Sequence, residues 1–199
     1  MPDIIDFQRF ALMTGLVIDN FEGGYYHPDM ALRMNESDRK LLAASGETMF
    51  GLDRMAGAEL ATYPEWKQFW NLVDNAGARM NWKHYYMGGQ YEKPLKELAS
   101  KIMFQWFTKL AHRYLMAGSI PKIDNDQRLI LHFSYASWNG EGWFKRFADA
   151  LNKATGSKEE IFQAAIKART MATNKLGLPN KAIRNAGIKM LNLFKTVHL

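Results

Sequence analysis

Cysteine is absent from this sequence, and its absence excludes several kinds of chemistry at once. Disulfide bonds, thiolate nucleophiles and cysteine-ligated zinc sites all require it. A chain of 199 residues, of which 47% are hydrophobic, can nevertheless bury a sizeable core without cross-links. We therefore expect a single domain over residues 1–199, in which 1–154 form the core and 155–199 form a basic helical pair packed on it.

Long uncharged runs are also missing. The longest one near the N-terminus covers Phe10 to Ile18, which is too short to cross a bilayer. The first six residues include acids but none of the basic residues that open a signal peptide. We expect no transmembrane segment and no signal peptide, and hence a protein that is made in the cytoplasm and needs help to leave it.

The familiar short motifs of catalysis and cofactor binding are missing as well. There is no nucleophile elbow, no P-loop, no dinucleotide-binding glycine fingerprint and no His-Glu-x-x-His zinc helix. No two histidines share the spacing of helical metal ligands; they are His27, His84, His112, His132 and His198. Asp124 and Asp126 stand where a helix is expected to begin, and an acid there more often caps free N–H groups than binds a metal. We expect neither a metal nor a cofactor.

What the sequence does contain is a strong helical period. Apolar residues recur at spacings of three and four, which predicts a mainly α fold. The stretch 92–117 is apolar on most sides, as is typical of a buried central helix. Two capping pairs, Asp124 with Gln127 and Ser157 with Glu160, mark later helix starts. The expected helices cover 7–21, 52–60, 64–76, 92–117, 124–137, 143–153, 157–177 and a final segment after Pro179.

The helical period fails after the first helix. Turn residues interrupt it from Tyr25 to Ser45, so we expect a short β-hairpin or an ordered loop there. Residues 81–90 are aromatic and contain glycine, and we expect a loop in that segment too. The predicted architecture is a helical domain with a long central helix and a small β-hairpin or loop lobe that follows the first helix in the chain.

The segment Phe21-Glu22-Gly23-Gly24-Tyr25-Tyr26 carries the clearest chemical signal. Glu22 ends an apolar helix, where the negative end of the helix dipole disfavours a carboxylate. Desolvation by surrounding aromatic residues would raise the pKa of this acid further. An acid that stays protonated near neutral pH can donate a proton to a glycosidic oxygen. The alternative interpretation is an ordinary glutamate in front of a glycine that ends the helix.

Three motifs follow one another along the chain. They are Glu22-Gly23-Gly24-Tyr25 with His27-Pro28-Asp29 behind it, then Ser45-Gly46-Glu47-Thr48-Met49-Phe50-Gly51, and then a turn within Phe133 to Gly140. In this order they resemble glycoside hydrolase family 108, the phage and prophage lysozymes also described as secretion-activator-like muramidases. The resemblance covers roughly residues 10–155. The chain departs from the family in three ways: 24 residues separate Glu22 from Glu47, residues 30–44 are inserted, and Ser45 replaces a glycine.

The resemblance implies a lysozyme-like helical domain that hydrolyses the β-1,4 bond between N-acetylmuramic acid and N-acetylglucosamine in peptidoglycan. Glu22 would be the general acid. Asp29 would be the second catalytic carboxylate, ranked above Asp38 and Glu47. Thr48 would hold the attacking water, and the alternative for Thr48 is that it caps a helix that follows it.

Aromatic residues in the expected loop are the best candidates for a sugar-binding groove, because loops carry binding residues. Together with two residues from the motifs, the predicted substrate-binding set is Tyr25, Glu47, Trp82, Tyr85 and Tyr86. Aromatic side chains mainly serve burial, so we expect most of the others, including Trp66, Phe69 and Trp70, to lie in the core.

On this interpretation the protein is a phage endolysin or a virion-associated tail lysozyme. Its partner is peptidoglycan, joined in the second case by other phage tail proteins, and it binds no specific nucleic acid. It acts in the periplasm or cell wall, or is carried in the virion. Two alternatives stay open. A lytic transglycosylase of the same fold needs one acid only, because the acetamido group of the substrate attacks. A non-enzymatic virion structural protein would use a basic surface instead.

The net charge of +6 is concentrated at one end of the chain. Residues 155–199 contain eight Lys/Arg and two Glu, whereas residues 1–154 are balanced. An excess of this kind attracts anionic polymers, including anionic cell-wall polymers. The alternative is a solvated helix face that serves solubility.

The charge distribution yields a first prediction. Reversing the charge at Lys181, Arg184, Lys189 and Lys195 should weaken binding to anionic wall sacculi at low salt. The effect should fade as salt is added, because exposed charges act over roughly 10 Å at moderate ionic strength. Pull-down with purified sacculi at several salt concentrations measures it. Equal binding of variant and parent at low salt would reduce the basic end to a role in solubility.

Overall fold

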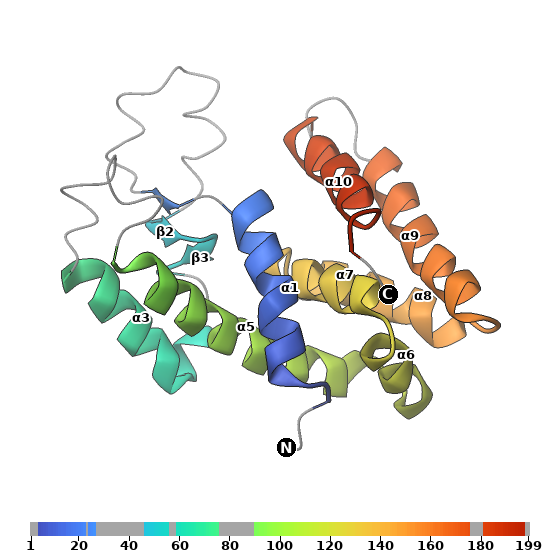
Figure 1. The fold of residues 1–199 in the computed structure, drawn as a ribbon, viewed down its shortest axis with the longest axis horizontal. Coiled ribbons are helices and arrows are strands. Elements are labelled where there is room, and N and C mark those ends of the chain that lie inside the picture. The colour runs from blue at the N-terminus through green and yellow to red at the C-terminus, as the bar shows by residue number, and fades with distance from the viewer. Residues whose placement is uncertain are drawn as a thin grey trace. The chain divides into compact units, whose positions relative to one another are not determined.

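The computed structural model describes residues 4–22, 24–26, 46–55, 59–75, 90–175 and 181–197. The fold is mainly helical with a small antiparallel sheet after the first helix, as the sequence predicts (Figure 1). The helices are α1 (Phe7–Asn20), α3 (Pro64–Asn75), α5 (Glu92–Tyr114), α6 (Ile120–Asp124), α7 (Gln127–Trp138), α8 (Glu141–Lys153), α9 (Lys158–Lys175) and α10 (Lys181–Leu193), with 3-10 turns η2 (Leu60–Thr62) and η4 (Ala117–Ser119). The strands are β1 (Tyr25–Tyr26), β2 (Thr48–Met49) and β3 (Leu52–Asp53).

The chain divides into two compact units. One comprises Gly15–Gln105, and the other comprises Met1–Thr14 together with Trp106–Leu199. The division falls inside α1 and inside α5, so each of these helices contributes residues to both units. Among the described residues, no helix is both long and apolar enough to span a membrane.

The unit Gly15–Gln105 contains the sheet, whose strand order is β1-β2-β3 with both pairs antiparallel. Cross-strand neighbours lie on the same face, so Tyr25, Met49 and Leu52 form one row, and all three are buried. On α3 the buried residues are Trp66, Phe69, Trp70 and Val73, which confirms the expected core role of these aromatic side chains.

The turn between β2 and β3 corrects one expectation. Residues 52–60 were expected to form a helix, but Leu52–Asp53 is strand β3. The two turn residues, Phe50 and Gly51, have φ angles of 50° and 71°. Positive φ at both central residues is the geometry of a two-residue hairpin turn, which suits the twist of the flanking strands. Strand pairing and this turn therefore override the local apolar spacing, and of the described residues in 52–60 only Leu60, at the start of η2, is helical.

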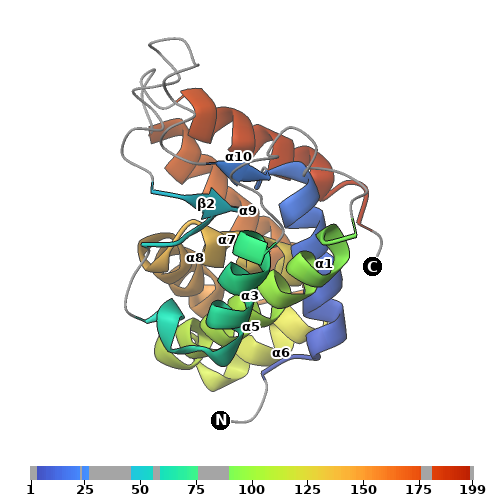
Figure 2. The same cartoon turned by 90° about the vertical axis from the view of Figure 1, so that its left-hand side faces the viewer.

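The other unit is built around α7. Residues Arg128 to Ser137 of this helix are all buried. The ring centroid of Phe133 lies 5.2 Å from that of Phe144, and the ring centroid of Phe144 lies 6.0 Å from that of Phe107. α7 packs on α8, α8 packs on α9, and α9 runs beside α10 (Figures 1 and 2). A stretch of successive helices thus encloses one aromatic core.

Two helix boundaries differ from expectation. α5 ends at Tyr114 rather than residue 117, and η4 and α6 follow it. α7 is capped by Asp126, whose carboxylate accepts a hydrogen bond from the backbone N–H of Arg128, and not by Asp124, which forms an ion pair with Arg9. The capping box at the start of α9 is confirmed: Ser157 Oγ accepts from the N–H of Glu160, and Oε2 of Glu160 accepts from the N–H of Ser157.

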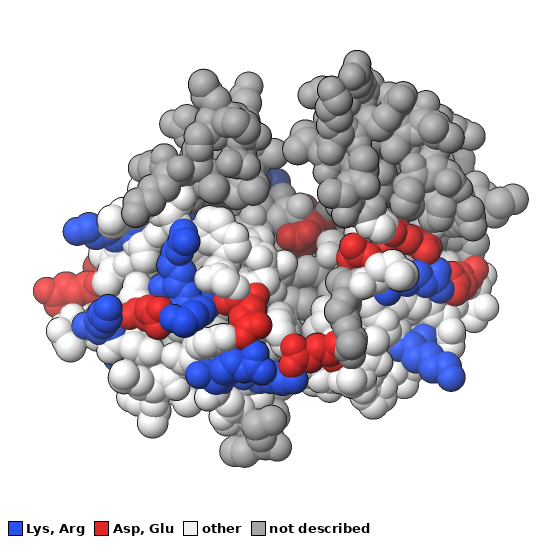
Figure 3. Space-filling model, turned by 180° about the vertical axis from the view of Figure 1, so that it is seen from behind, with Lys and Arg blue, Asp and Glu red and all other residues white. Residues whose placement is uncertain are grey.

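One basic residue of the last quarter is not on the surface. Arg169 of α9 is buried, with its guanidinium 4.6 Å from the Phe147 ring centroid and its Nε donating to Nδ1 of His132. Burial lowers the pKa of Arg169 to about 10 and lowers the pKa of His132 well below its ordinary value. Lys189 and Lys195 are exposed. On the face shown in Figure 3, basic and acidic side chains of the described residues alternate.

The contrast between Asp124 and Asp126 can be tested directly. Asp126→Ala removes the α7 cap and one of the two carboxylates that bind buried Arg128, so the free energy of unfolding should fall by about 1–3 kcal/mol. Asp124→Ala removes only a partly exposed ion pair and should change the free energy of unfolding by less than about 0.5 kcal/mol. Urea denaturation of both variants measures the difference. Equal losses would contradict the assignment of the cap to Asp126.

Candidate active site

Glu22 follows the C-terminal end of α1 in the chain by two residues. The backbone N–H groups of Phe21 and Glu22 both donate to the carbonyl oxygen of Val17, at 2.9 and 3.3 Å. The second of these bonds spans five residues, as bonds that close a helix C-terminus often do. Glu22 is therefore fixed by the last turn of α1.

The β2–β3 turn closes over the carboxyl group of Glu22. The N–H of Phe50 donates to the carbonyl oxygen of Gly24 at 3.2 Å, which fastens the turn to the chain segment behind Glu22. A Cβ atom on Gly51 would lie 2.1 Å from Oε2 of Glu22, and the φ of Gly51 is positive. Glycine suits position 51 in two ways: it adopts the positive φ without strain, and it leaves room for the carboxyl group in its present position.

Glu22 is an acid with a raised pKa. Its side chain is partly buried, and burial raises its pKa from an ordinary 4.5 to about 7. No described residue forms a hydrogen bond or an ion pair with its carboxyl group. The direction agrees with the expectation from sequence, and its cause is desolvation, which disfavours the charged form. At neutral pH a large share of Glu22 is therefore protonated.

Glu47 has a different environment. Oε1 of Glu47 accepts a hydrogen bond from the hydroxyl of Tyr25 at 2.7 Å, and Oε2 accepts one from Arg54 at 2.9 Å. The ring of Tyr25 is 1% exposed. These two residues were expected to bind substrate, but the structure joins them to each other inside the sheet. Tyr25 does not line an open surface, and its hydroxyl holds Glu47.

Arg54 connects this pair to α3. Its Nη1 donates to Asp74 at 2.9 Å, and its guanidinium lies 4.9 Å from the centroid of the Trp70 ring. The hydrogen bonds to Asp74 are the largest cause that raises the pKa of Arg54 above its ordinary value. Sequence reasoning missed Arg54 and Asp74, because they lie 20 residues apart on different elements and no local pattern links them.

Thr48 and Asp53 occupy the second face of the sheet. They are cross-strand partners, and Tyr26 is the neighbour of Thr48 on β1. Because Thr48 belongs to strand β2, the idea that it caps a following helix is wrong. Asp53 was not among the expected site residues; its carboxylate accepts hydrogen bonds from the N–H groups of Gly46 and Met55, at 3.3 and 2.8 Å.

Several predicted site residues lie outside the described part of the chain. They are Asp29, Asp38, Trp82, Tyr85 and Tyr86. The structure therefore brings together Glu22, Gly51 and the hairpin that carries Thr48, with Glu47 and Tyr25 at its base.

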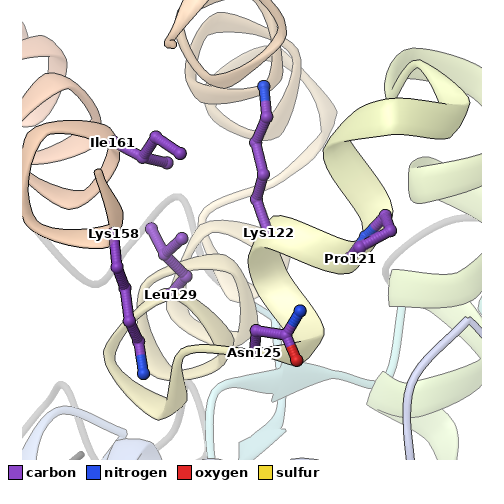
Figure 4. A pocket seen from close by; sticks show the side chains of 6 residues that line it. All are labelled: Pro121, Lys122, Asn125, Leu129, Lys158 and Ile161. Atoms are coloured by element: carbon purple, nitrogen blue, oxygen red, sulfur yellow. The ribbon is translucent and has the colours of Figure 1, made fainter. Parts of the chain in front are cut away.

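Other chemistry was sought in the described residues. No group of three or more His, Asp or Glu side chains among them is arranged to hold a metal ion. A hollow of about 250 Å³ lies between α6, α7 and α9 in the other unit (Figure 4). It is smaller than usual ligand pockets, and its lining contains no acid: Pro121, Lys122, Asn125, Leu129, Lys158 and Ile161. The Nζ of Lys122 donates to carbonyl oxygens of Leu151 and Ala154 at the end of α8. This hollow offers no catalytic group.

Comparison with protein-family models, with curated proteins and with solved structures finds no match to this chain in any of the three. The resemblance to family 108 thus stays a prediction from its motifs.

The raised pKa of Glu22 predicts a pH-dependent stability difference. A carboxyl group with a folded-state pKa of about 7 and an ordinary value of 4.5 stabilises the folded state at low pH, and this contribution is lost as the pH rises to about 7. Glu22→Gln removes the titration, so its Tm relative to the parent should rise between pH 5 and pH 8. Thermal unfolding at both pH values measures this.

The matched control is Glu97→Gln. Hydrogen bonding to Lys101 lowers the pKa of this exposed acid, so its titration lies below the tested range. The Tm difference of Glu97→Gln from the parent should be the same at pH 5 and pH 8. A Glu22→Gln difference that is equally constant would contradict the raised pKa.

Proposed function

We propose that this protein is a glycoside hydrolase that cleaves peptidoglycan, with Glu22 as its general acid. One observation carries the proposal. The carboxyl group of Glu22 lies against the Gly51 turn, and burial raises its pKa to about 7 in the absence of an ionic partner among the described residues. A general acid works best when its pKa lies near the working pH. The order of the three sequence motifs supports the choice of peptidoglycan as the substrate.

The proposed reaction begins with Glu22 in its protonated state. Protonated Glu22 donates to the oxygen of the β-1,4 bond between N-acetylmuramic acid and N-acetylglucosamine, and the departing sugar leaves a positively charged, oxocarbenium-like ring. A carboxylate must then activate water or attack the ring, and Asp29 is the residue that we propose for this role. Thr48, which lies on the second face of the sheet, would help to hold the water.

The biological setting follows from the same proposal. We propose a phage endolysin or a virion-associated tail lysozyme, acting in the periplasm or cell wall or carried in the virion. Peptidoglycan is its main partner, with phage tail proteins joining it if the enzyme belongs to the virion. Lys189 and Lys195, which are exposed, would contact the anionic wall polymers.

A lytic transglycosylase is the second candidate, and a specific observation favours it. The two described carboxylates of the hairpin region are both engaged: Glu47 by Tyr25 and Arg54, and Asp53 by backbone N–H groups. Neither is free to act as a base. Transglycosylation needs only one acid: the substrate's acetamido group attacks the anomeric carbon as Glu22 protonates the leaving oxygen, and the C6 hydroxyl of the same sugar then displaces the acetamido oxygen and returns its proton to the Glu22 carboxylate. Its product ends in 1,6-anhydromuramic acid, whereas hydrolysis leaves a reducing end.

The decisive experiment compares wall lysis by the parent, Glu22→Gln and Glu97→Gln. Glu22→Gln should lose activity by on the order of a hundredfold or more, because general acid catalysis contributes about that much, while Glu97→Gln should retain it. Turbidity of purified cell walls gives the rate, mass spectrometry of the released fragments gives the end group, and circular dichroism checks folding. A folded parent protein without lytic activity would contradict the proposal and favour a non-enzymatic virion protein.

A further inference from the structure

The β2–β3 hairpin is fastened at both of its ends. At the turn, Phe50 donates to the carbonyl of Gly24, and Gly51 meets the carboxyl group of Glu22. At the open end, the backbone N–H of Arg54 donates to the carbonyl oxygen of Glu47 at 2.8 Å, which closes the last rung of the ladder. A hairpin this short has little stability of its own, so its position depends on these fastenings.

The side chain of Arg54 provides the strongest connection at the open end. It binds Glu47 on one side and both carboxylate oxygens of Asp74 on the other, and its guanidinium lies over the Trp70 ring. Asp74 and Trp70 both belong to α3. A planar guanidinium that makes two hydrogen bonds to one carboxylate fixes orientation as well as distance. Arg54 thus ties the base of the hairpin to α3.

We propose that Arg54 is the positioning residue of this site: by tying the hairpin to α3, it holds the Gly51 turn against the carboxyl group of Glu22. Its significance for catalysis rests on the proposed function, whereas the positioning itself does not. Arg54 touches neither Glu22 nor a reacting bond, so it is not a catalytic residue. If the tie is broken, the turn should move away and water should reach Glu22.

The proposal predicts in which direction the pKa of Glu22 changes when Arg54 is replaced. If Arg54 acted on Glu22 through its positive charge, removing that charge would raise the pKa of Glu22, because a cation stabilises the carboxylate. If Arg54 acts by positioning, its removal lets water in, and the pKa of Glu22 falls towards 4.5. The two mechanisms therefore predict opposite shifts.

Other charged groups of this unit that the structure describes have partners of their own. Asp19 of α1 binds Lys96 of α5 at 2.6 Å, and Lys96 also contacts Glu92. In the hairpin region, Glu47 is paired with Arg54, and Asp53 accepts backbone N–H groups. Burial alone accounts for the raised pKa of Glu22. A change in that pKa after mutation of Arg54 would therefore report access of water.

The test is an NMR titration of the Glu22 carboxyl carbon in protein labelled at glutamate, with the signal assigned by its loss in Glu22→Gln. In Arg54→Gln the pKa of Glu22 should fall by about one unit or more. Asp74→Asn cuts the same tie from α3 and should also lower the pKa, to which the loss of the Asp74 charge contributes. Arg54→Met keeps the test valid if Arg54→Gln does not fold, because it loses the same charge and the same tie while its apolar side chain can still pack on Trp70.

Two further variants complete the design. Arg54→Lys keeps the charge but loses the two-point contact with Asp74, so the pKa should lie between those of the parent and Arg54→Gln. Arg113→Gln breaks an ion pair with Glu141 in the other unit and changes the charge equally, so it should leave the pKa of Glu22 unaltered. An unchanged or raised pKa in Arg54→Gln, or in Arg54→Met if Arg54→Gln does not fold, would overturn the proposal.

Wall lysis adds a kinetic readout that separates the two proposals. If Glu22 must be protonated, activity declines above its pKa, and this decline should move to lower pH in Arg54→Gln. The loss relative to the parent should be on the order of tenfold at pH 7 and small at pH 5. A parent protein without lytic activity would refute the proposed function alone, because the carboxyl titration still decides whether Arg54 positions the turn.

Discussion

The contact between the Gly51 turn and the carboxyl group of Glu22 is the constraint on which the proposed chemistry depends. A carboxylate in water is ionised at neutral pH, and only the removal of water brings its pKa to about 7 here. A side chain at position 51 would occupy the space of Oε2, so the enclosure needs glycine. It also needs the sheet, because the turn reaches Glu22 only when β2 pairs with β1.

Three described acids near the hairpin, Glu22, Glu47 and Asp74, have two kinds of electrostatic environment. Glu47 and Asp74 share Arg54 and are held by charge-assisted hydrogen bonds. Glu22, in contrast, is partly buried and has no cationic partner among the described residues. Neighbouring acids whose environments differ in this way can serve different roles in one reaction. In this site the paired acids support the scaffold, and the unpaired acid is the one suited to proton transfer. Arg54 connects the two environments, since it fixes the element that encloses Glu22.

The other unit shows that charge counted along a sequence is not the same as charge on a surface. Arg169 belongs to the basic last quarter but is buried against His132 and aromatic rings. The flat guanidinium tolerates this environment, because its plane stacks on ring faces and its charge is delocalised. His132 stays neutral beside it, and its Nδ1 serves as an acceptor. The surface charge that the described part of the C-terminal region presents therefore comes from exposed lysines such as Lys189 and Lys195, and not from Arg169.

The amino-acid sequence by itself determined the helical class, most helix positions, the capping box at Ser157 and the place of Glu22 at the end of the first helix. These features depend on periodicity and on contacts between residues a few positions apart, which a single sequence displays. The helix expected over 52–60 failed because pairing with distant strands decided that segment. Only the tertiary structure placed Gly51 against Glu22 and Arg54 against Asp74. Those contacts join residues on separate elements, and nothing in the local spacing of the chain encodes their meeting.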